Sequence, residues 1–216
     1  MIDYPLLAPE LTDAHIAAGC RLAREWNIGC LVVRPSDVDE AIRWMDGSGI
    51  AVGSTTGWPN GIAVTGTKLY EGRDLLRRGV KEIDFVINVG KVISRQFQYV
   101  ETELMQIAKS CLEVGAVLKV NLRSELLDDD LKIIATKICK RVDAQMMAIA
   151  GTEDDFRVIG PLLKDRIQLK VASPIQTLPE ALQSKANGVA RFTATAVAQI
   201  LTDWKSHLAR AAESVS

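Results

Sequence analysis

Short runs rich in β-branched residues alternate with longer segments of helical period, and this alternation constrains the fold more than any other feature. The runs predict eight strands, at Ile2–Leu7, Ile28–Arg34, Ile50–Thr56, Glu82–Val89, Val117–Arg123, Ala144–Ala150, Ile167–Ala172 and Gly188–Thr193. Helices are expected at Leu11–Trp26, Ser36–Met45, Thr65–Arg78, Phe97–Val114, Leu127–Arg141, Thr152–Lys164, Thr177–Lys185 and Ala194–Glu213. Strands that alternate with helices pair in parallel through right-handed crossovers. The pattern therefore predicts an α/β chain with one domain over residues 1–216, a single (β/α)8 TIM barrel.

A doubly wound open sheet is the alternative α/β architecture. No G-x-G-x-x-G follows the early strands and no G-x-x-x-x-G-K-[ST] occurs, so the nucleotide-binding forms of that fold are disfavoured. At the helix ends, Ser36 is expected to be an N-cap, and Gly79 and Gly115 are expected to end their helices.

The balance of charge and hydropathy excludes several classes of function. The net charge of −1 offers no basic surplus for a phosphate backbone, and no apolar run is long enough to cross a membrane. The N-terminus lacks a secretory pattern, and the four cysteines show no C-x-x-C spacing. With only two histidines, neither a histidine-centred triad nor a multi-histidine metal site is expected. We expect a cytoplasmic protein with reduced thiols, no metal, no cofactor, and no nucleic-acid or membrane partner.

Charged residues interrupt strands that should be apolar on both faces of a parallel sheet. Asp84 lies in the predicted strand EIDFVINV, with Asn88 on the same face four residues later. Lys170 stands between two apolar residues of another strand. A third strand carries Lys119, Asn121 and Arg123 on one face. Because an isolated buried charge is costly, we expect Asp84 and Lys170 to pair across the barrel interior.

Such a pair has chemical uses at the carboxyl ends of barrel strands, where active sites gather. A desolvated lysine has a lowered pKa and can act as a nucleophilic amine, and a neighbouring aspartate can relay protons. The alternative is that charged strand residues face solvent at the strand ends.

Several segments, in their order along the chain, resemble the deoxyribose-phosphate aldolase family. Asp3–Leu7 stands where that family has Asp-His-Thr-Leu-Leu, and Gly57–Gly61 is similar to its Gly-Phe-Pro-x-Gly. Glu82–Gly90 matches its fourth strand best. The resemblance covers essentially the whole chain and implies a barrel with class I aldolase chemistry. It also implies that Asp84 and Lys170 correspond to the family's proton-handling aspartate and second lysine.

The sequence departs from the family at two functional positions. Where the family's sixth strand carries the Schiff-base lysine, alignment on Gly151 places Met147, and no lysine lies between Lys140 and Lys164. The glycine-rich phosphate site is also changed: Pro174 follows Ser173 and removes a backbone donor. Residues expected around the substrate are Asp3, Trp58, Asn88, Lys119, Arg123, Met147, Ser173 and Thr193.

Three functions remain open. The first is an enzyme with changed lyase, aldolase-type or acid–base chemistry on a small carbonyl substrate other than deoxyribose 5-phosphate, with Lys170 and Asp84 as catalytic residues and Arg123 binding a carboxylate. The second is an inactive aldolase-like protein that binds a ligand or partner. The third is an aldolase in which another lysine, such as Lys119, replaces the missing one. The apolar stripe of the last helix is either a barrel-packing surface or a homodimer contact.

Overall fold

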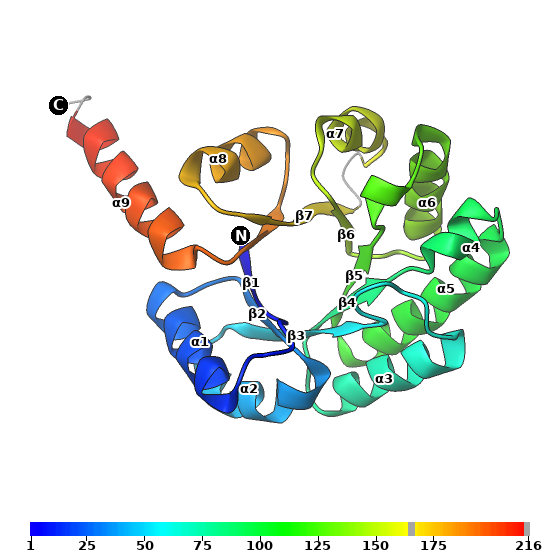
Figure 1. The fold of residues 1–216 in the computed structure, drawn as a ribbon, viewed down its shortest axis with the longest axis horizontal. Helices are drawn as coiled ribbons and strands as arrows, with labels where there is room; N and C mark the ends of the chain where they lie inside the picture. The colour runs from blue at the N-terminus through cyan, green and yellow to red at the C-terminus, as the bar shows by residue number, and fades with distance from the viewer. Residues whose placement is uncertain (164–166, 214–216) are drawn as a thin grey trace.

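Eight parallel strands close into a barrel in a computed structural model that describes residues 1–163 and 167–213 (Figure 1). Each strand pairs with the next one in the chain, and β8 pairs with β1 to close the sheet. The (β/α)8 barrel predicted from the alternation is confirmed. The strands are β1 (Ile2–Leu6), β2 (Cys30–Val33), β3 (Ala51–Thr56), β4 (Glu82–Val86), β5 (Val117–Asn121), β6 (Met146–Ile149), β7 (Gln168–Ile175) and β8 (Arg191–Ala194).

Helices surround this barrel, and α9 packs against α8 and α1 before its far end extends outward from the ring (Figure 1). None of the helices in the described part of the chain is long and apolar enough to span a membrane. The helices are α1 (Asp13–Trp26), α2 (Val38–Met45), α3 (Thr65–Arg77), α4 (Val89–Ile93), α5 (Phe97–Val114), α6 (Asp129–Arg141), α7 (Glu153–Ile159), α8 (Leu178–Ala186) and α9 (Val197–Glu213), with 3-10 turns η1 (Pro35–Asp37), η2 (Ser124–Leu126) and η3 (Gly160–Leu162).

Two strands, β4 and β5, end more than one residue earlier than predicted, because polar residues turn the chain at the barrel mouth. β4 stops at Val86, and the side chain of Asn88 accepts a hydrogen bond from the backbone N of Lys91 to start α4, which the sequence did not predict. β5 stops at Asn121, and Arg123 adopts a left-handed conformation with φ of 48°.

The predicted helix ends agree in part with the structure. Gly115 ends α5 with φ of 67°, as expected. Gly79 instead follows the C-cap residue Arg78. Ser36 is not the N-cap of α2, because Pro35 begins a 3-10 turn that makes Asp37 the cap. Lys164, the last residue of a predicted helix, lies outside the described residues.

The strands separate an apolar layer from a charged interior. Alternate strand residues such as Leu31, Phe85 and Val120 are fully buried and belong to the hydrophobic core that faces the helices. The residues between them point to the barrel axis, and several of these are charged. Because the sheet is parallel, the carboxyl ends of all eight strands meet at one mouth of the barrel, where the site lies.

Candidate active site

Three carboxylates and three cations converge inside the barrel, so their formal charges cancel. They come from five different strands, and every side chain is buried except that of Arg191, which is 20% exposed. The six residues are Asp3, Glu82, Asp84, Lys119, Lys170 and Arg191. Buried charges of this kind are tolerated only when each one has partners.

The upper part of this cluster lies at the mouth of the barrel. The Nζ of Lys170 is 3.0 Å from Asp84 Oδ1 and 3.1 Å from Oδ2, so the predicted ion pair forms. The same Nζ is 2.9 Å from Asp3 Oδ2. Two carboxylates therefore contact the same lysine nitrogen.

The lower part of the cluster lies deeper in the barrel, away from the mouth. Lys119 Nζ contacts Asp3 Oδ2 at 2.6 Å and Glu82 Oε2 at 2.5 Å, but lies 3.8 Å from Asp84. Arg191 donates to Asp3 Oδ1 at 2.8 Å and to Glu82 Oε1 at 3.0 Å. Asp3 thus joins the upper and lower parts.

Burial and charge act in opposite directions on these groups. Burial alone would raise the pKa of Asp3, but Lys170 and Lys119 hold it well below its usual range. Burial alone would lower the pKa of Lys119, and the surrounding acidic groups raise it well above its ordinary value instead. The network is therefore ionised at neutral pH at both of these residues.

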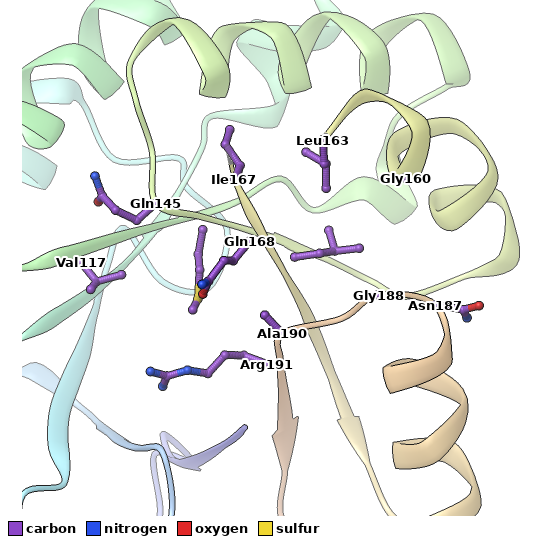
Figure 2. A pocket seen from close by; sticks show the side chains of 12 residues that line it. Val117, Gln145, Gly160, Leu163, Ile167, Gln168, Asn187, Gly188, Ala190 and Arg191 are labelled. Atoms are coloured by element: carbon purple, nitrogen blue, oxygen red, sulfur yellow. The ribbon is translucent and has the colours of Figure 1, made fainter. Parts of the chain in front are cut away.

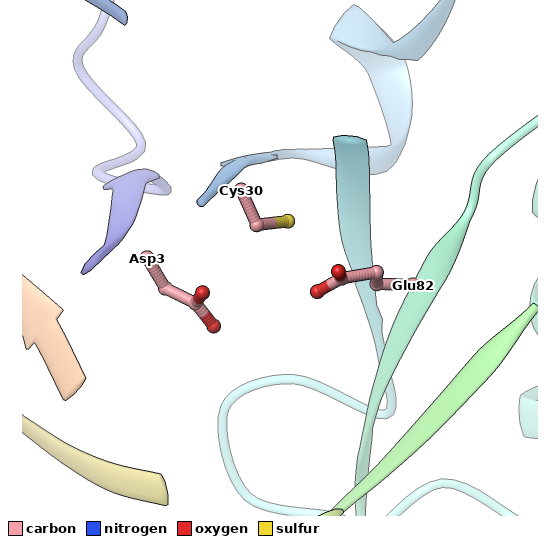
Figure 3. A group of neighbouring side chains, drawn as sticks. All are labelled: Asp3, Cys30 and Glu82. Carbon is pink, nitrogen blue, oxygen red and sulfur yellow. The ribbon is translucent and has the colours of Figure 1, made fainter. Parts of the chain in front are cut away.

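Asp3, Cys30 and Glu82 place three possible metal-ligand atoms within 4.8 Å of one another (Figure 3). Their surroundings do not fit a metal ion. Both carboxylates already accept hydrogen bonds from Lys119 or Arg191. Burial, as the largest cause, raises the pKa of the Cys30 thiol well above its usual range, which disfavours the thiolate that a metal needs.

A cavity of about 370 Å³ opens above Lys170 at the barrel mouth. Five of the predicted site residues line it: Asp3, Trp58, Asp84, Lys170 and Thr193. Trp58 is 48% exposed and belongs to the loop after β3. The residues that complete the lining are Pro5, Leu7, Ala8, Val32, Thr55, Asn121, Ala172, Pro174 and Thr195.

A second cavity, of about 690 Å³, lies at the opposite end of the barrel (Figure 2). The first residues of β5, β6, β7 and β8 line it, including Gln168 and Arg191. Leu163 and Ile167 also line it. Asp84 and Lys170 are not part of its lining.

The prediction that Arg123 joins Asp84 and Lys170 is wrong. Because β5 ends at Asn121, the left-handed backbone of Arg123 directs its guanidinium along the rim. There it donates to the carbonyl oxygen of Pro59 at 2.8 Å and to Glu125 at 2.6 Å. Arg123 does not line the cavity.

Three more of the predicted residues lie outside the cavity lining. Asn88 is occupied as the cap of α4. Ser173 is an exposed residue of β7. Lys119 is fully buried beneath Asp3, too deep to reach a molecule in the cavity, which removes it as a replacement for the missing lysine.

The register of β6 corrects the position of the missing lysine. Ala148 pairs with Lys170 and with Asn121, so these three neighbours share the interior face. Met147 pairs with Val120 and Leu169 and belongs to the fully buried apolar core. The expectation that Met147 contacts substrate is therefore wrong, and the interior position beside Lys170 is Ala148.

Three polar lining residues, Thr55, Asn121 and Thr195, are absent from the set that the sequence analysis placed around the substrate. Asn121 shares its face with Lys119, two residues earlier on β5. Thr55 is the direct neighbour of Asp84 across β3 and β4, which becomes visible only once the register is known.

Lys68 shows that helix surfaces in this chain also bury charge. Lys68 is fully buried and bonds to Glu103 at 2.7 Å and to the carbonyl oxygen of Val86 at 2.8 Å. Glu71, on the same helix, accepts from Thr56 and from the backbone N of Gly57, which fixes the loop that carries Trp58.

Comparison with known proteins gives relatives over nearly the whole chain, although no protein-family model matches it. A deoxyribose-phosphate aldolase of Clostridium kluyveri is 29% identical, covering 93% of this chain and 95% of its own length. The enzyme of Rhodopirellula baltica is 27% identical, covering 96% and 89%. A solved structure described as "QR15, an Aldolase" superposes with a TM-score of 0.88 at 25% identity, covering 95% of each chain. Together with the shared barrel, these matches make the chain a distant homologue of the deoxyribose-phosphate aldolase family over nearly its full length.

Proposed function

We propose that this protein is an aldolase-like enzyme that acts on a small carbonyl substrate, with Lys170 and Asp84 transferring protons. The observation that carries the proposal is the Lys170–Asp84 pair at 3.0 Å, buried in the barrel and lining the mouth cavity. A paired acid and base inside a cleft is typical of a catalytic site.

The pair has the groups that aldol cleavage needs. The Asp84 carboxylate accepts the proton of a substrate hydroxyl while the neighbouring carbon–carbon bond breaks and an aldehyde leaves. The Lys170 ammonium gives a proton to the oxygen of the other fragment, which becomes an enol. The enol then takes the proton from Asp84 at carbon and returns its hydroxyl proton to Lys170. Both residues end in their starting states, so the step is redox-neutral.

Proton transfer is favoured over imine formation at Lys170. An amine must lose its proton before it attacks a carbonyl. Two carboxylates hold the Lys170 nitrogen in ion pairs at 2.9 and 3.0 Å, so attack on a carbonyl would first have to break these contacts, and Ala148 beside it supplies no second amine.

Lys170→Met tests this role because it keeps an unbranched side chain of nearly the same length and removes the charge. We expect turnover to fall roughly 10²–10⁴-fold, the usual effect of a positioned acid–base group. Asp84→Asn should have an effect of similar size. Borohydride added during turnover should trap no adduct on Lys170 in the wild-type protein. Full activity of Lys170→Met would contradict the proposal, and a trapped adduct would replace proton transfer with imine chemistry.

We expect no useful cleavage of deoxyribose 5-phosphate. The interior of β6 carries Ala148 instead of an imine-forming lysine, and Pro174 cannot donate a backbone hydrogen bond to a phosphate. A coupled assay for acetaldehyde release measures this. A rate comparable to that of a typical family member would contradict the expectation.

A binding protein without activity is the second candidate, and Ala148 is the observation that favours it. The two candidates differ in one readout. A binding protein would bind a carbonyl compound saturably and release it unchanged. Lys170→Met would then change the affinity for this compound, and neither the wild-type protein nor the variant would show turnover.

A further inference from the structure

We infer that the mouth cavity selects an uncharged carbonyl compound, one that carries neither a phosphate nor a carboxylate group. The inference rests on the proposed function, because it specifies the substrate class of the same cavity. It follows from the ion pairs and hydrogen bonds that the charged groups of the cavity and its rim already make.

The cavity lining contains two carboxylates and one ammonium group among the described residues. These are Asp3, Asp84 and Lys170, and the ammonium already contacts both carboxylates. Beneath them, Lys119 and Arg191 are paired with Asp3 and Glu82. An anion that entered would meet carboxylates without a free cation, which is an unfavourable contact.

Two arginines at the rim are also occupied. Arg123 bonds to Glu125 and to the carbonyl oxygen of Pro59. Arg34 bonds to Asp37 at 2.6 Å, and its other nitrogens donate to backbone carbonyl oxygens of the β1–α1 loop at 2.9–3.2 Å. Each guanidinium is therefore already paired with a carboxylate and holds a loop, so binding a substrate anion would require it to break or share these contacts.

At the start of α8, where backbone N–H groups could hold an anion, a carboxylate of the chain itself already lies beside the backbone. Glu180 Oε2 accepts from the backbone N of Gln176 at 2.9 Å, and Thr177 caps the helix. The side chain of Gln176 bonds to Thr195 of the cavity lining at 3.1 Å. Pro174, also in the lining, has no N–H to offer. A phosphate placed here would face Glu180.

The remaining walls suit a short, neutral molecule. Trp58, Leu7 and Val32 offer apolar surface, whereas Asn121 and Thr193 offer hydrogen bonds without net charge. The volume of about 370 Å³ is near the lower end of ligand pockets. These walls fit a few carbons bearing carbonyl and hydroxyl oxygens.

Matched pairs of probes test the inference by binding. We would measure dissociation constants by ligand-observed NMR for 2-deoxyribose against 2-deoxyribose 5-phosphate, and for butanal against 4-oxobutanoate. We expect the uncharged member of each pair to bind at least about tenfold more tightly, since one unpaired like-charge contact costs that much or more.

Glu180→Gln tests the carboxylate at the start of α8. Removing its charge should narrow the preference between 2-deoxyribose and its phosphate about 2–5-fold, the effect expected for one charge at a helix end. Glu113→Gln is the matched control, because Glu113 is exposed near the end of α5, at the opposite end of the barrel, and should leave the preference unchanged.

The outcomes separate the inference from the proposed function. If the charged probes bind more tightly than their uncharged partners, the inference is wrong while the proposed enzyme stands. If no carbonyl probe of either kind binds and none is converted, the proposed function fails, and the inference fails with it.

Discussion

At the scale of single residues, this chain buries lysines in structural ion pairs as well as at its candidate site. Lys68 lies under the loop that carries Trp58 and is paired with Glu103, both without solvent exposure. Burial lowers the pKa of Lys68 and raises that of Glu103, so the environment favours the neutral form of each and their contact opposes this. Removing one partner of such a pair costs more stability than replacing both partners together.

Lys68→Met should therefore destabilise the protein by about 3–5 kcal/mol, because it leaves the Glu103 carboxylate buried without its partner. The double variant Lys68→Met/Glu103→Leu should regain much of that loss, since no buried charge is left. Urea unfolding of the two variants measures both values. A double variant as unstable as the single one would show that Lys68 acts mainly through its bond to Val86.

Met147→Ala should cost about 2–5 kcal/mol of stability, the usual range for emptying a buried methionine position. Its effect on turnover should be small, because Met147 faces the helix layer and does not line the cavity. Denaturant unfolding and a turnover assay on the same preparation check the two halves of this prediction. A normal unfolding midpoint with lost activity would place Met147 at the site after all.

At the scale of elements, the register of β6 decides which position faces the site. Ala148 is aligned with Lys170, whereas Met147 is aligned with Leu169. Sequence alignment on Gly151 could not distinguish these two positions, because a shift of one residue exchanges the two faces of a strand.

Ala148→Lys should place an amine on the interior face next to Lys170. The neighbouring ammonium should lower the pKa of the new amine, which favours imine formation. We expect borohydride with acetaldehyde to trap an adduct at position 148, located by peptide mass mapping. Met147→Lys is the matched control: it should give no adduct at 147 and should destabilise the fold, because it places an unpaired charge in the apolar layer. An adduct on the control alone would contradict the register.

The sequence predicted the barrel well, because alternation of strand and helix is a local signal that repeats eight times. It also predicted the contact of Asp84 and Lys170, because burial in apolar strands leaves two opposite charges few alternatives to pairing. It could not predict the path of Arg123, which depends on where β5 ends and on a left-handed backbone. The helix α4 was missed for a similar reason, since it begins at the N-cap that the side chain of Asn88 forms.

At the scale of the whole molecule, the interior network links β1 to strands far along the chain. Asp3 bonds to Lys119, Lys170 and Arg191, and thereby joins β1 to β5, β7 and β8. Since the carboxylate of Asp3 is stabilised in the folded state, its pKa lies below the ordinary value of 3.8. The stability from this group is fully present above pH 3.8 and is lost as the pH falls through the lowered pKa of the folded state.

We therefore expect that Asp3 adds no pH dependence to the urea unfolding midpoint between about pH 5 and 7. Below about pH 4 the midpoint should fall steeply. Asp3→Asn should lower the midpoint at pH 7 and reduce the steepness of the acid limb. Asp46→Asn, at an exposed residue after α2, should leave the profile close to that of the wild-type protein. An unchanged acid limb in Asp3→Asn would show that other carboxylates control acid unfolding.

The cancellation of three negative and three positive charges inside the barrel has a consequence for ionic strength. Mobile ions weaken interactions between charges that water surrounds, over a Debye length of about 10 Å at 0.1 M salt, but they do not enter a buried cluster. A cluster without net charge also exerts little long-range force on ions outside it. We therefore expect sodium chloride between about 0.05 and about 0.5 M to leave the contribution of this network to the free energy of unfolding nearly unchanged. The contribution of exposed pairs such as Arg157–Asp129 should fall over the same range.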